Sequence, residues 1–419
     1  MNILFLTNPT YGCYGYGIVA KYVCKGLREA GHNVWVIGTV TAGNMLKDQH
    51  GTPNIPPYFD GYAKYALRQY IKGFDIDVVV TLLDCWDPRT HEIPDIVHSF
   101  KIPLISHVTA RSYPLSPHWN TFLYRVDHIV TPTQWGRVIV EEIFPKKTSY
   151  IQHGVNSDVF KPDMKAREEM RKKLGYEDKF VFLAVGRNKE MQKRYDFMFK
   201  AFKTFLMHTP KAKNKVVLHV HTSPHEAYNL EELRDMGFHK IGKDYIQFTT
   251  VKWNEKKEKL EICNKDNPNA MTLNPNWGLD EEEMVKLYNM ADCFVHSGEG
   301  ESFCLPLIES QACGLPSVVP NHSSFQELVG IPECGIVCKT VTEETTPTLT
   351  DVKLIDILDL AKGMHKIYSD KKIREICSKN AIKNSEKYSW NRAIEKWLFI
   401  LKKVAEPKPL NYQTGDLGI

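Results

Sequence analysis

Two glutamates, Glu301 and Glu309, flank a mostly apolar segment in the stretch EGESFCLPLIESQACGLP, residues 299–316. A carboxylate is costly to bury unless it is paired or hydrogen-bonded. The stretch follows the apolar run CFVHSG, which predicts a strand, and the residues Gly-Leu-Pro end the helix that would come next. Glu301 is therefore expected at the carboxyl end of a strand, and Glu309 within the following helix.

Backbone amides lie between the two glutamates. Ser302, Phe303, Cys304 and Leu305 stand at the start of the expected helix, where N–H groups have no helical partner and can bind negative charge. A nucleotide sugar offers a matching order of groups, with ribose hydroxyls, a diphosphate and sugar hydroxyls. The alternative is a carboxylate that complements the helix dipole, with Glu309 on the solvent face. That alternative explains either glutamate but explains the pair poorly.

Two cations follow another apolar run, in AVGRNKEMQKRYDFMFKAF. Arg187 lies at the tip of the expected strand and Lys193 lies near the start of the next helix. Arginine offers a fork of donors and lysine a point charge, and together they suit a diphosphate. A solvated basic loop is an equally good interpretation of this stretch alone, since Lys189 and Arg194 are also present.

The first expected strand is followed by a glycine-rich turn, NPTYGCYGYGIVAKYV. Gly12, Gly15 and Gly17 precede an expected helix, and glycines there let backbone amides approach an anionic ligand. The spacing is not that of a dinucleotide fingerprint, and a tight turn is an equally good interpretation. His107, in ISHVT, also ends an expected strand and could donate to a sugar or phosphate. Taken alone, His107 is better explained as a core histidine.

The elements that position these residues form two series of apolar runs. NILFLTN, NVWVIGTV, DVVVTLLD, PLISHVT, HIVTPT and TSYIQHGV come first, and FVFLAVG, VVLHVHTS, YIQFTTV, CFVHSG, SVVPN and GIVCK follow a polar stretch near 155–180. Apolar runs separated by helical patterns predict parallel sheets covered on both faces. Ligands bind outside the carboxyl ends of such strands, where most of the candidate residues lie. SWNRAIEKWLFILKK predicts a final amphipathic helix.

The composition is that of a globular protein of 419 residues with a formal net charge of +4. The N-terminus MNILFLTNPT lacks the basic and long apolar regions of a signal peptide, and no run is long enough for a membrane helix. The ten scattered cysteines form no CxxC pair. We expect a cytoplasmic protein with reduced thiols, with room for a peripheral contact at the cytoplasmic membrane face.

These motifs together resemble the retaining glycosyltransferases of the GT-B fold, in particular the family 4 group. The resemblance includes the E-x7-E stretch, the glycine turn and its helix, YIQHGVNSDVFKP, VGRNKEMQKRYDFMFKAF, EEEMVKLYNMADCFVHSGEGESF and YSWNRAIEKW, in the same order. It implies an α/β fold of two Rossmann-like, doubly wound parallel-sheet domains that face each other across a cleft. It also implies transfer of a sugar from a nucleoside diphosphate to a hydroxyl acceptor.

The resemblance assigns roles to individual residues. Glu309 would hold the donor ribose, and Glu301 with the amides of 302–305 would hold the transferred sugar. Arg187 and Lys193 would stabilise the leaving diphosphate. The departing phosphate would help take the acceptor's proton, so that no protein nucleophile, metal or other cofactor is expected.

The remaining roles belong to the first domain, and two positions depart from the family pattern. Gly15 and Gly17 would bring backbone against the donor phosphates, and His107 would lie beside the sugar. Cys304 stands where the family commonly has glycine, as does Arg194, and the choice of sugar is left open by this. The pair Asp75 and Asp77 mimics a metal motif, but we interpret it as strand-edge carboxylates.

The resemblance also divides the chain. We expect an acceptor-binding domain at 1–160, a donor-binding domain at 165–385, a helix at 386–404 that crosses back, and a tail at 405–419. The partners would be a nucleotide-sugar donor and a saccharide or lipid-linked acceptor approached by the loop 112–115. A non-catalytic nucleotide-sugar-binding module and a transferase that acts on modified DNA are the alternatives, although the mild net charge does not indicate nucleic acid.

Overall fold

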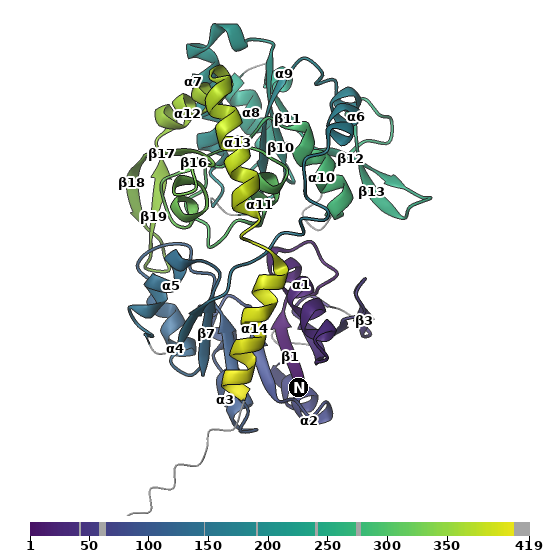
Figure 1. Ribbon diagram of the computed structural model, residues 1–419, viewed down its shortest axis with the longest axis vertical. Coiled ribbons are helices and arrows are strands. Elements are labelled where there is room, and N and C mark those ends of the chain that lie inside the picture. The colour runs from purple at the N-terminus through teal and green to yellow at the C-terminus, as the bar shows by residue number, and fades with distance from the viewer. Residues whose placement is uncertain are drawn as a thin grey trace, which may run out of the picture.

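The chain folds into two mostly parallel sheets with helices on both faces, stacked along the long axis in Figure 1. A C-terminal helix, α14 (Trp390–Ala405), begins where the two parts meet and lies along the lower one. The structure is a computed structural model, and it describes residues 1–41, 43–57, 64–145, 147–189, 192–238, 242–273 and 278–405. The predicted fold class, with two Rossmann-like units, is confirmed. The proposed residue limits of the domains stay predictions, and the expected tail lies outside the described residues from 406 onward.

The first sheet has eight strands in the order β3-β4-β2-β1-β5-β6-β7-β8. Its strands are β1 (Asn2–Thr7), β2 (Asn33–Gly38), β3 (Leu46–Lys47), β4 (Pro53–Ile55), β5 (Val78–Thr81), β6 (Leu104–His107), β7 (His128–Thr131) and β8 (Thr148–Tyr150). Its helices are α1 (Gly15–Glu29), α2 (Lys64–Gly73), α3 (Ile93–His98), α4 (Asn120–Leu123) and α5 (Gln134–Glu141). Every pairing is parallel except that of β3 with β4.

The apolar run of β1 shows why a strand here carries no polar face. Ile3 and Phe5 pack into one hydrophobic cluster, and Leu4 and Leu6 pack into another on the opposite face of the sheet. Successive side chains of a strand point to opposite faces, so a sheet covered on both sides needs apolar residues at every position.

The second sheet has six parallel strands in the order β11-β10-β9-β15-β16-β17. They are β9 (Phe180–Val185), β10 (Val216–His221), β11 (Ile246–Phe248), β15 (Cys293–Val295), β16 (Ser317–Pro320) and β17 (Gly335–Cys338). The helices are α6 (Met164–Leu174), α7 (Tyr195–His208), α8 (Leu230–Phe238), α9 (Gly242–Tyr245), α10 (Glu281–Met290), α11 (Leu305–Ala312), α12 (Ile357–Ser369) and α13 (Lys371–Ser385).

Two small sheets were not expected from the sequence. One contains β12 (Thr250–Asn254), β13 (Lys259–Cys263) and β14 (Met271–Thr272), and the other is the hairpin β18 (Thr340–Thr345) and β19 (Asp351–Ile355). The run YIQFTTV, predicted as one strand, is divided between β11 and β12 in different sheets. The hairpin also falls partly in a region predicted to be mostly helical.

The crossing helix α14 is confirmed as amphipathic, with Trp397 and Leu401 buried. The Trp397 ring packs edge-on against Phe5 of β1, with 6.3 Å between ring centroids. Gly26 of α1 permits this close approach, because a side chain there would meet Ile394. One hydrophobic cluster therefore contains residues of β1, β9 and α14, and it joins the two units through the helix.

Two expectations about surface and compartment can be compared with the structure. All ten cysteines are free, in accord with reduced thiols. Among the described residues, no helix is long and apolar enough to cross a membrane.

Candidate active site

The carboxyl ends of the two parallel sheets meet. The glycine turn after β1 touches the second unit, because a side chain added at Gly278 would meet the Cys13 thiol. The Arg187 guanidinium, after β9, lies 5.9 Å from the centre of the Tyr14 ring. Lys21 of α1 forms an ion pair of 3.0 Å with Glu281 at the start of α10. The edges that were predicted to hold the ligand therefore face each other.

Two charged or polar side chains contact the carboxylate of Glu301. Lys193 and His296 both hydrogen-bond its Oε1, and the His296 Nε2 atom lies 3.0 Å away. The Gly298 N–H donates to His296 Nδ1 at 3.0 Å, which leaves Nε2 as the protonated nitrogen that donates to Glu301. Among the described residues, Glu301 Oε2 has no partner and can accept a hydrogen bond from a ligand.

The charges in this cluster stabilise one another. Burial would raise the pKa of Glu301, but the ammonium of Lys193 and the hydrogen bond from His296 hold that pKa well below its usual range. Burial would lower the pKa of Lys193, but Glu301 outweighs it and the pKa is raised. Burial lowers the pKa of His296 despite Glu301. At neutral pH the site therefore holds a carboxylate, an ammonium and a neutral imidazole.

The backbone after Glu301 presents unpaired donors, as predicted. No described residue accepts a hydrogen bond from the amides of Ser302, Phe303, Cys304 or Leu305, and the N-terminus of α11 has no side-chain cap. Cys304 adopts a φ of +70°, in the left-handed region that favours glycine. A non-glycine residue in this conformation costs about 1 kcal/mol or more, so the chain keeps a strained turn at the site.

The second departure from the family pattern has the same geometry. Arg194 has a φ of +45° at the start of α7, where the resemblance placed a glycine. Its guanidinium forms ion pairs with Asp196 at 3.3 Å and with Glu299 at 3.1 Å. The side chain that replaces glycine thus ties the loop of Lys193 to the loop of Glu301.

Glu309 lies on α11 in a different environment. The Tyr288 hydroxyl donates to its Oε2 at 2.6 Å, and no cation of the described residues forms an ion pair with it. Burial raises the pKa of Glu309 to about 7, with a smaller contribution from Glu281. The Glu309 Oε1 atom has no partner among the described residues. The two glutamates are thus both partly buried, but the pKa of Glu301 is lowered and the pKa of Glu309 is raised.

Arg187 and Lys193, which were predicted to act together, hold different carboxylates. Arg187 forms an ion pair of 2.6 Å with Glu226, and its side chain is 44% exposed. Lys193 forms its ion pair with Glu301. Arg187 instead lies beside the glycine turn through its contact with Tyr14.

The two glycines of the turn have different surroundings. A side chain at Gly17 would come within 2.5 Å of the Pro9 carbonyl oxygen, so glycine is required there for the turn itself. A side chain at Gly15 would meet open space. The helix α1 that begins at Gly15 has no side-chain cap. Of the two, Gly15 is the position where backbone is open to a ligand.

His107 is placed deeper than the predicted sugar contact requires. It is 2% exposed at the end of β6, and its ring packs edge-on against Trp397. Its Nε2 atom lies 3.3 Å from Nε2 of His153, and the His153 ring lies 4.9 Å from that of Phe303. Burial lowers the pKa of His107 to about 3, so its ring stays neutral. The link from His107 to the loop 302–305 therefore runs through His153.

The loop suspected of contacting an acceptor is held by the hairpin β18–β19. The Thr350 hydroxyl donates to the Pro114 carbonyl at 2.8 Å, and its oxygen is hydrogen-bonded to Ser112 Oγ at 2.9 Å. The Asp351 N–H donates to the Tyr113 carbonyl at 3.1 Å. The Tyr113 side chain remains 49% exposed. The second unit thus fixes the backbone of this first-unit loop and leaves one aromatic ring free of the contact.

Three side chains at the site were missed by the sequence reasoning. His296 and His153 each follow an expected strand, in CFVHSG and YIQHGV, so the rule applied to His107 would have found them. Tyr288 lies inside α10 and carries no signal in the sequence. Asp75 and Asp77 lie at the opposite edge, where Asp77 accepts a hydrogen bond from the Asn2 N–H, as predicted for strand-edge carboxylates.

One group at the site has the donor types of a metal centre. The ligand atoms of His296, Glu301 and Cys304 lie within 4.8 Å of one another. However, Glu301 is already paired with Lys193, and burial raises the pKa of the Cys304 thiol well above its usual range. A protonated thiol and an occupied carboxylate fit a metal ion poorly.

Comparison with known proteins identifies a related family. Residues 166–384 match the family described as Glycosyl transferases group 1. The chain is 24% identical over 266 residues to a D-inositol 3-phosphate glycosyltransferase from Geodermatophilus obscurus, which covers 62% of this chain and 48% of the relative. It is 28% identical over 144 residues to the sulfoquinovosyl transferase SQD2 of Arabidopsis thaliana, which covers 32% of this chain. The chain spans about a quarter of SQD2 and about half of the first relative.

The fold is shared with solved structures. HepE from Anabaena in complex with UDP-glucose superposes with a TM-score of 0.69 at 15% identity, covering 96% of this chain and 100% of HepE. At this identity the likeness concerns the fold. It places the two facing sheets described above in a known two-domain architecture.

Proposed function

This chain belongs to the group 1 glycosyl transferases, and from that premise we propose that it transfers a sugar from a nucleoside diphosphate sugar to a hydroxyl acceptor with retention of anomeric configuration. The observation that carries the proposal is the Lys193–Glu301–His296 cluster beside four free amides. This arrangement combines acceptors for sugar hydroxyls with donors for a leaving phosphate.

The free amides and Lys193 supply the transition-state stabilisation in this proposal. Charge builds on the departing diphosphate as the glycosidic bond breaks, and donors fixed in advance stabilise it without reorganisation. Lys193, in the loop that precedes α7, would lie beside the same diphosphate, and its ammonium forms an ion pair with Glu301. Arg187, 44% exposed beside the glycine turn, completes the cationic side when it exchanges Glu226 for phosphate oxygens.

Glu301 and Glu309 would hold the two ends of the donor. Glu301 keeps a free Oε2 for a hydroxyl of the transferred sugar, and Glu309 keeps a free Oε1 for the ribose. Among the described residues, the site holds no serine or cysteine that is hydrogen-bonded to a base, and in the reaction that we propose the departing phosphate accepts the acceptor's proton. The acceptor would be a saccharide hydroxyl, free or lipid-linked, that approaches Tyr113.

No metal is required in this proposal, because Lys193 supplies the positive charge beside Glu301. HepE, which shares the fold, was solved with UDP-glucose, and this favours uridine nucleotides as the first donors to try. The donor's base and sugar remain to be found by experiment.

The test is a thermal-shift screen of UDP-, GDP-, ADP- and CMP-sugars, each beside its free diphosphate, with and without EDTA. We expect one base class to raise the melting temperature, with EDTA having no effect. The best donor is then incubated with saccharide acceptors, and the anomeric configuration of the product is read by NMR.

Three results would contradict the proposal. If no nucleotide raises the melting temperature, the chain does not bind the donor that we propose. Loss of stabilisation with EDTA would remove the metal-independent mechanism. An inverted product would remove the proposed mechanism and leave the sugar transfer intact.

A further inference from the structure

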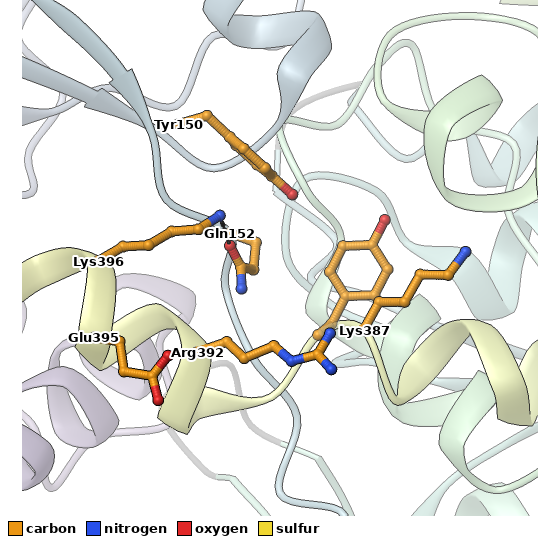
Figure 2. A pocket seen from close by; sticks show the side chains of 7 residues that line it. Tyr150, Gln152, Lys387, Arg392, Glu395 and Lys396 are labelled. Carbon is orange, nitrogen blue, oxygen red and sulfur yellow. Dashed lines mark hydrogen bonds between the residues drawn. The ribbon is translucent and has the colours of Figure 1, made fainter.

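An open groove lies where the chain crosses back from the second unit to the first. Its volume is about 450 Å3, and it lies away from the Lys193–Glu301 cluster. One wall is formed by Tyr150 at the end of β8 and by Gln152, and the other by residues 387–396, which include the first turns of α14. Figure 2 shows Tyr150 reaching in from the first wall and Arg392 from the second.

The groove carries an excess of positive charge. Lys387, Arg392 and Lys396 line it, against the single carboxylate of Glu395. Lys396 donates to Gln152 Oε1 at 2.6 Å, drawn as a dashed line in Figure 2, and its ammonium lies 4.3 Å from the centre of the Tyr150 ring. Among the described residues, Lys387 and Arg392 have no carboxylate within ion-pair distance. Lys387 and Arg392 therefore have no counter-ion in the part of the chain that the structure describes.

Two tyrosine hydroxyls give the groove a second feature of a binding site. Tyr388 is only 6% exposed, yet it lines the groove, and its hydroxyl has no hydrogen-bond partner among the described residues. Tyr150 lines the groove with a hydroxyl that is likewise unpartnered. Burial raises the pKa of both tyrosines, so both hydroxyls stay protonated donors. The two hydroxyls that line the groove can therefore donate to a ligand there.

The Glu327 carboxylate, which lies near the groove, does not accept hydrogen bonds from the hydroxyls of Tyr150 and Tyr388. Glu327 lies close enough to raise the pKa of Tyr150 and Tyr388. Its two carboxylate oxygens accept hydrogen bonds from the amides of Gln134 and Trp135, at 3.2 and 3.1 Å. Glu327 is therefore engaged by the N-terminus of α5 and leaves the groove's donors to an external ligand.

The groove connects two parts of the fold that a ligand could hold together. The Val155 N–H donates to the Tyr388 carbonyl at 2.7 Å, at the junction of the two units. The Tyr388 ring packs edge-on against Phe303, with 5.5 Å between centroids. An occupant that touches Tyr388 is therefore one ring away from the loop 302–305 of the candidate active site.

We propose that this groove is a second anion site, which binds the phosphate group of a small molecule through Arg392, Lys396 and the hydroxyls of Tyr150 and Tyr388. A guanidinium fork, an ammonium and neutral hydroxyl donors match the several oxygens of a phosphate. The size of the groove admits a phosphorylated monosaccharide, and the tyrosine rings offer apolar faces to its carbon skeleton. Free inorganic phosphate presents the same oxygens and is the other source of the ligand chemistry.

The test measures binding by calorimetry and thermal shift at constant ionic strength. The probes are glucose 6-phosphate, glucose and inorganic phosphate, each added to the full chain with saturating nucleoside diphosphate to occupy the donor site. We expect glucose 6-phosphate to bind and glucose not to bind. Arg392→Ala and Lys396→Met should each weaken binding at least tenfold.

Two further variants test whether the charge of the groove itself determines phosphate binding. Glu395→Gln removes the one carboxylate of the groove and should tighten phosphate binding severalfold. Lys383→Ala removes an exposed cation of α13 outside the groove and should change nothing. Arg392 and Glu395 are exposed, so their replacement leaves the core intact.

The results distinguish free phosphate from a phosphorylated sugar as the ligand, and specific binding from charge screening. Equal affinity for inorganic phosphate and glucose 6-phosphate supports the site with free phosphate as its ligand. Weakening by Lys383→Ala as strong as that by Arg392→Ala would show unspecific charge screening and overturn the proposal. Binding that survives both groove variants, or that needs an empty donor site, would overturn it too.

Discussion

Glu301 and Glu309 are the same residue type in one stretch of chain, and their surroundings set their charges in opposite directions. Glu301 meets Lys193 and His296, and its pKa is held well below the usual range. Among the residues that the structure describes, Glu309 is hydrogen-bonded only by the Tyr288 hydroxyl, and burial raises its pKa to about 7. Comparable burial thus produces a permanent anion at one end of the stretch and a titrating group at the other. The partner, rather than the residue or its burial, decides the protonation state.

Removing Lys193 is the most direct test of why the pKa of Glu301 differs from that of Glu309. Lys193→Met leaves a buried carboxylate paired only with neutral His296, so the pKa of Glu301 should rise and the stability should fall by about 3–5 kcal/mol. Chemical unfolding at pH 7 measures this loss. The loss should narrow as the pH falls from 7 to 5, because a raised pKa lets Glu301 take up a proton in the folded variant. The double variant Lys193→Met/Glu301→Gln should recover most of the stability, and failure to do so would refute the pairing.

Glu301 itself is the second point to test. Glu301→Gln keeps the shape and the hydrogen bond from His296 but removes the charge, and we expect turnover to fall by about 100- to 1,000-fold. Steady-state kinetics with the best donor measures the loss. Glu282→Gln, whose side chain is 72% exposed, is the matched control and should stay near wild-type turnover. Near-normal turnover of Glu301→Gln would remove Glu301 from the site.

Glu309 should make the stability of the protein depend on pH. Its folded pKa lies above the unfolded value, so the stability that it contributes is fully present below about pH 4.5 and is lost as the pH rises through about 7. The variant Glu309→Gln lacks this term and keeps an acceptor for Tyr288. It should match wild type near pH 5 and exceed it at pH 8 by up to about 3 kcal/mol. Parallel melts at the two pH values measure the difference, and equal pH profiles would contradict it.

Donor binding should follow the same titration. If the ionised Glu309 accepts hydrogen bonds from the ribose, nucleotide affinity in wild type should rise by roughly tenfold between pH 6 and 8. Glu309→Gln should bind with little dependence on pH in that range. Calorimetry at several pH values gives the slope. A wild-type affinity that does not change with pH would place the ribose elsewhere.

The smallest effect concerns the strained turn between the two glutamates. Cys304→Gly and Cys304→Ala both remove the thiol, but only glycine adopts the observed φ of +70° without strain. The glycine variant should therefore be more stable than the alanine variant by about 1 kcal/mol. Differential scanning calorimetry compares the two, and an alanine variant that is equally stable would show that the turn relaxes.

The sequence predicted the parallel sheets because their physical cause is local. A strand buried on both faces must be apolar at successive positions, as Ile3 to Leu6 are, and such runs are visible in the chain. The carboxyl ends of those runs carried nearly all the candidate residues. The hairpin β18–β19 was not visible, since five of the six residues of β18 are exposed and nothing in their pattern demands a strand. The run YIQFTTV changes sheets at Thr249, a buried residue whose hydroxyl is hydrogen-bonded to two histidines of β10.

What the sequence determined by itself was the order of the elements and the chemical types at their ends: two glutamates, two cations, free amides and glycines. The tertiary structure alone decided which of them act on each other. Lys193 reaches Glu301 across 108 positions of chain, while Arg187 takes Glu226. The groove beside α14 joins residues near 150 to residues near 390. Charges interact through distance in space, and separation along the chain carries no record of that distance.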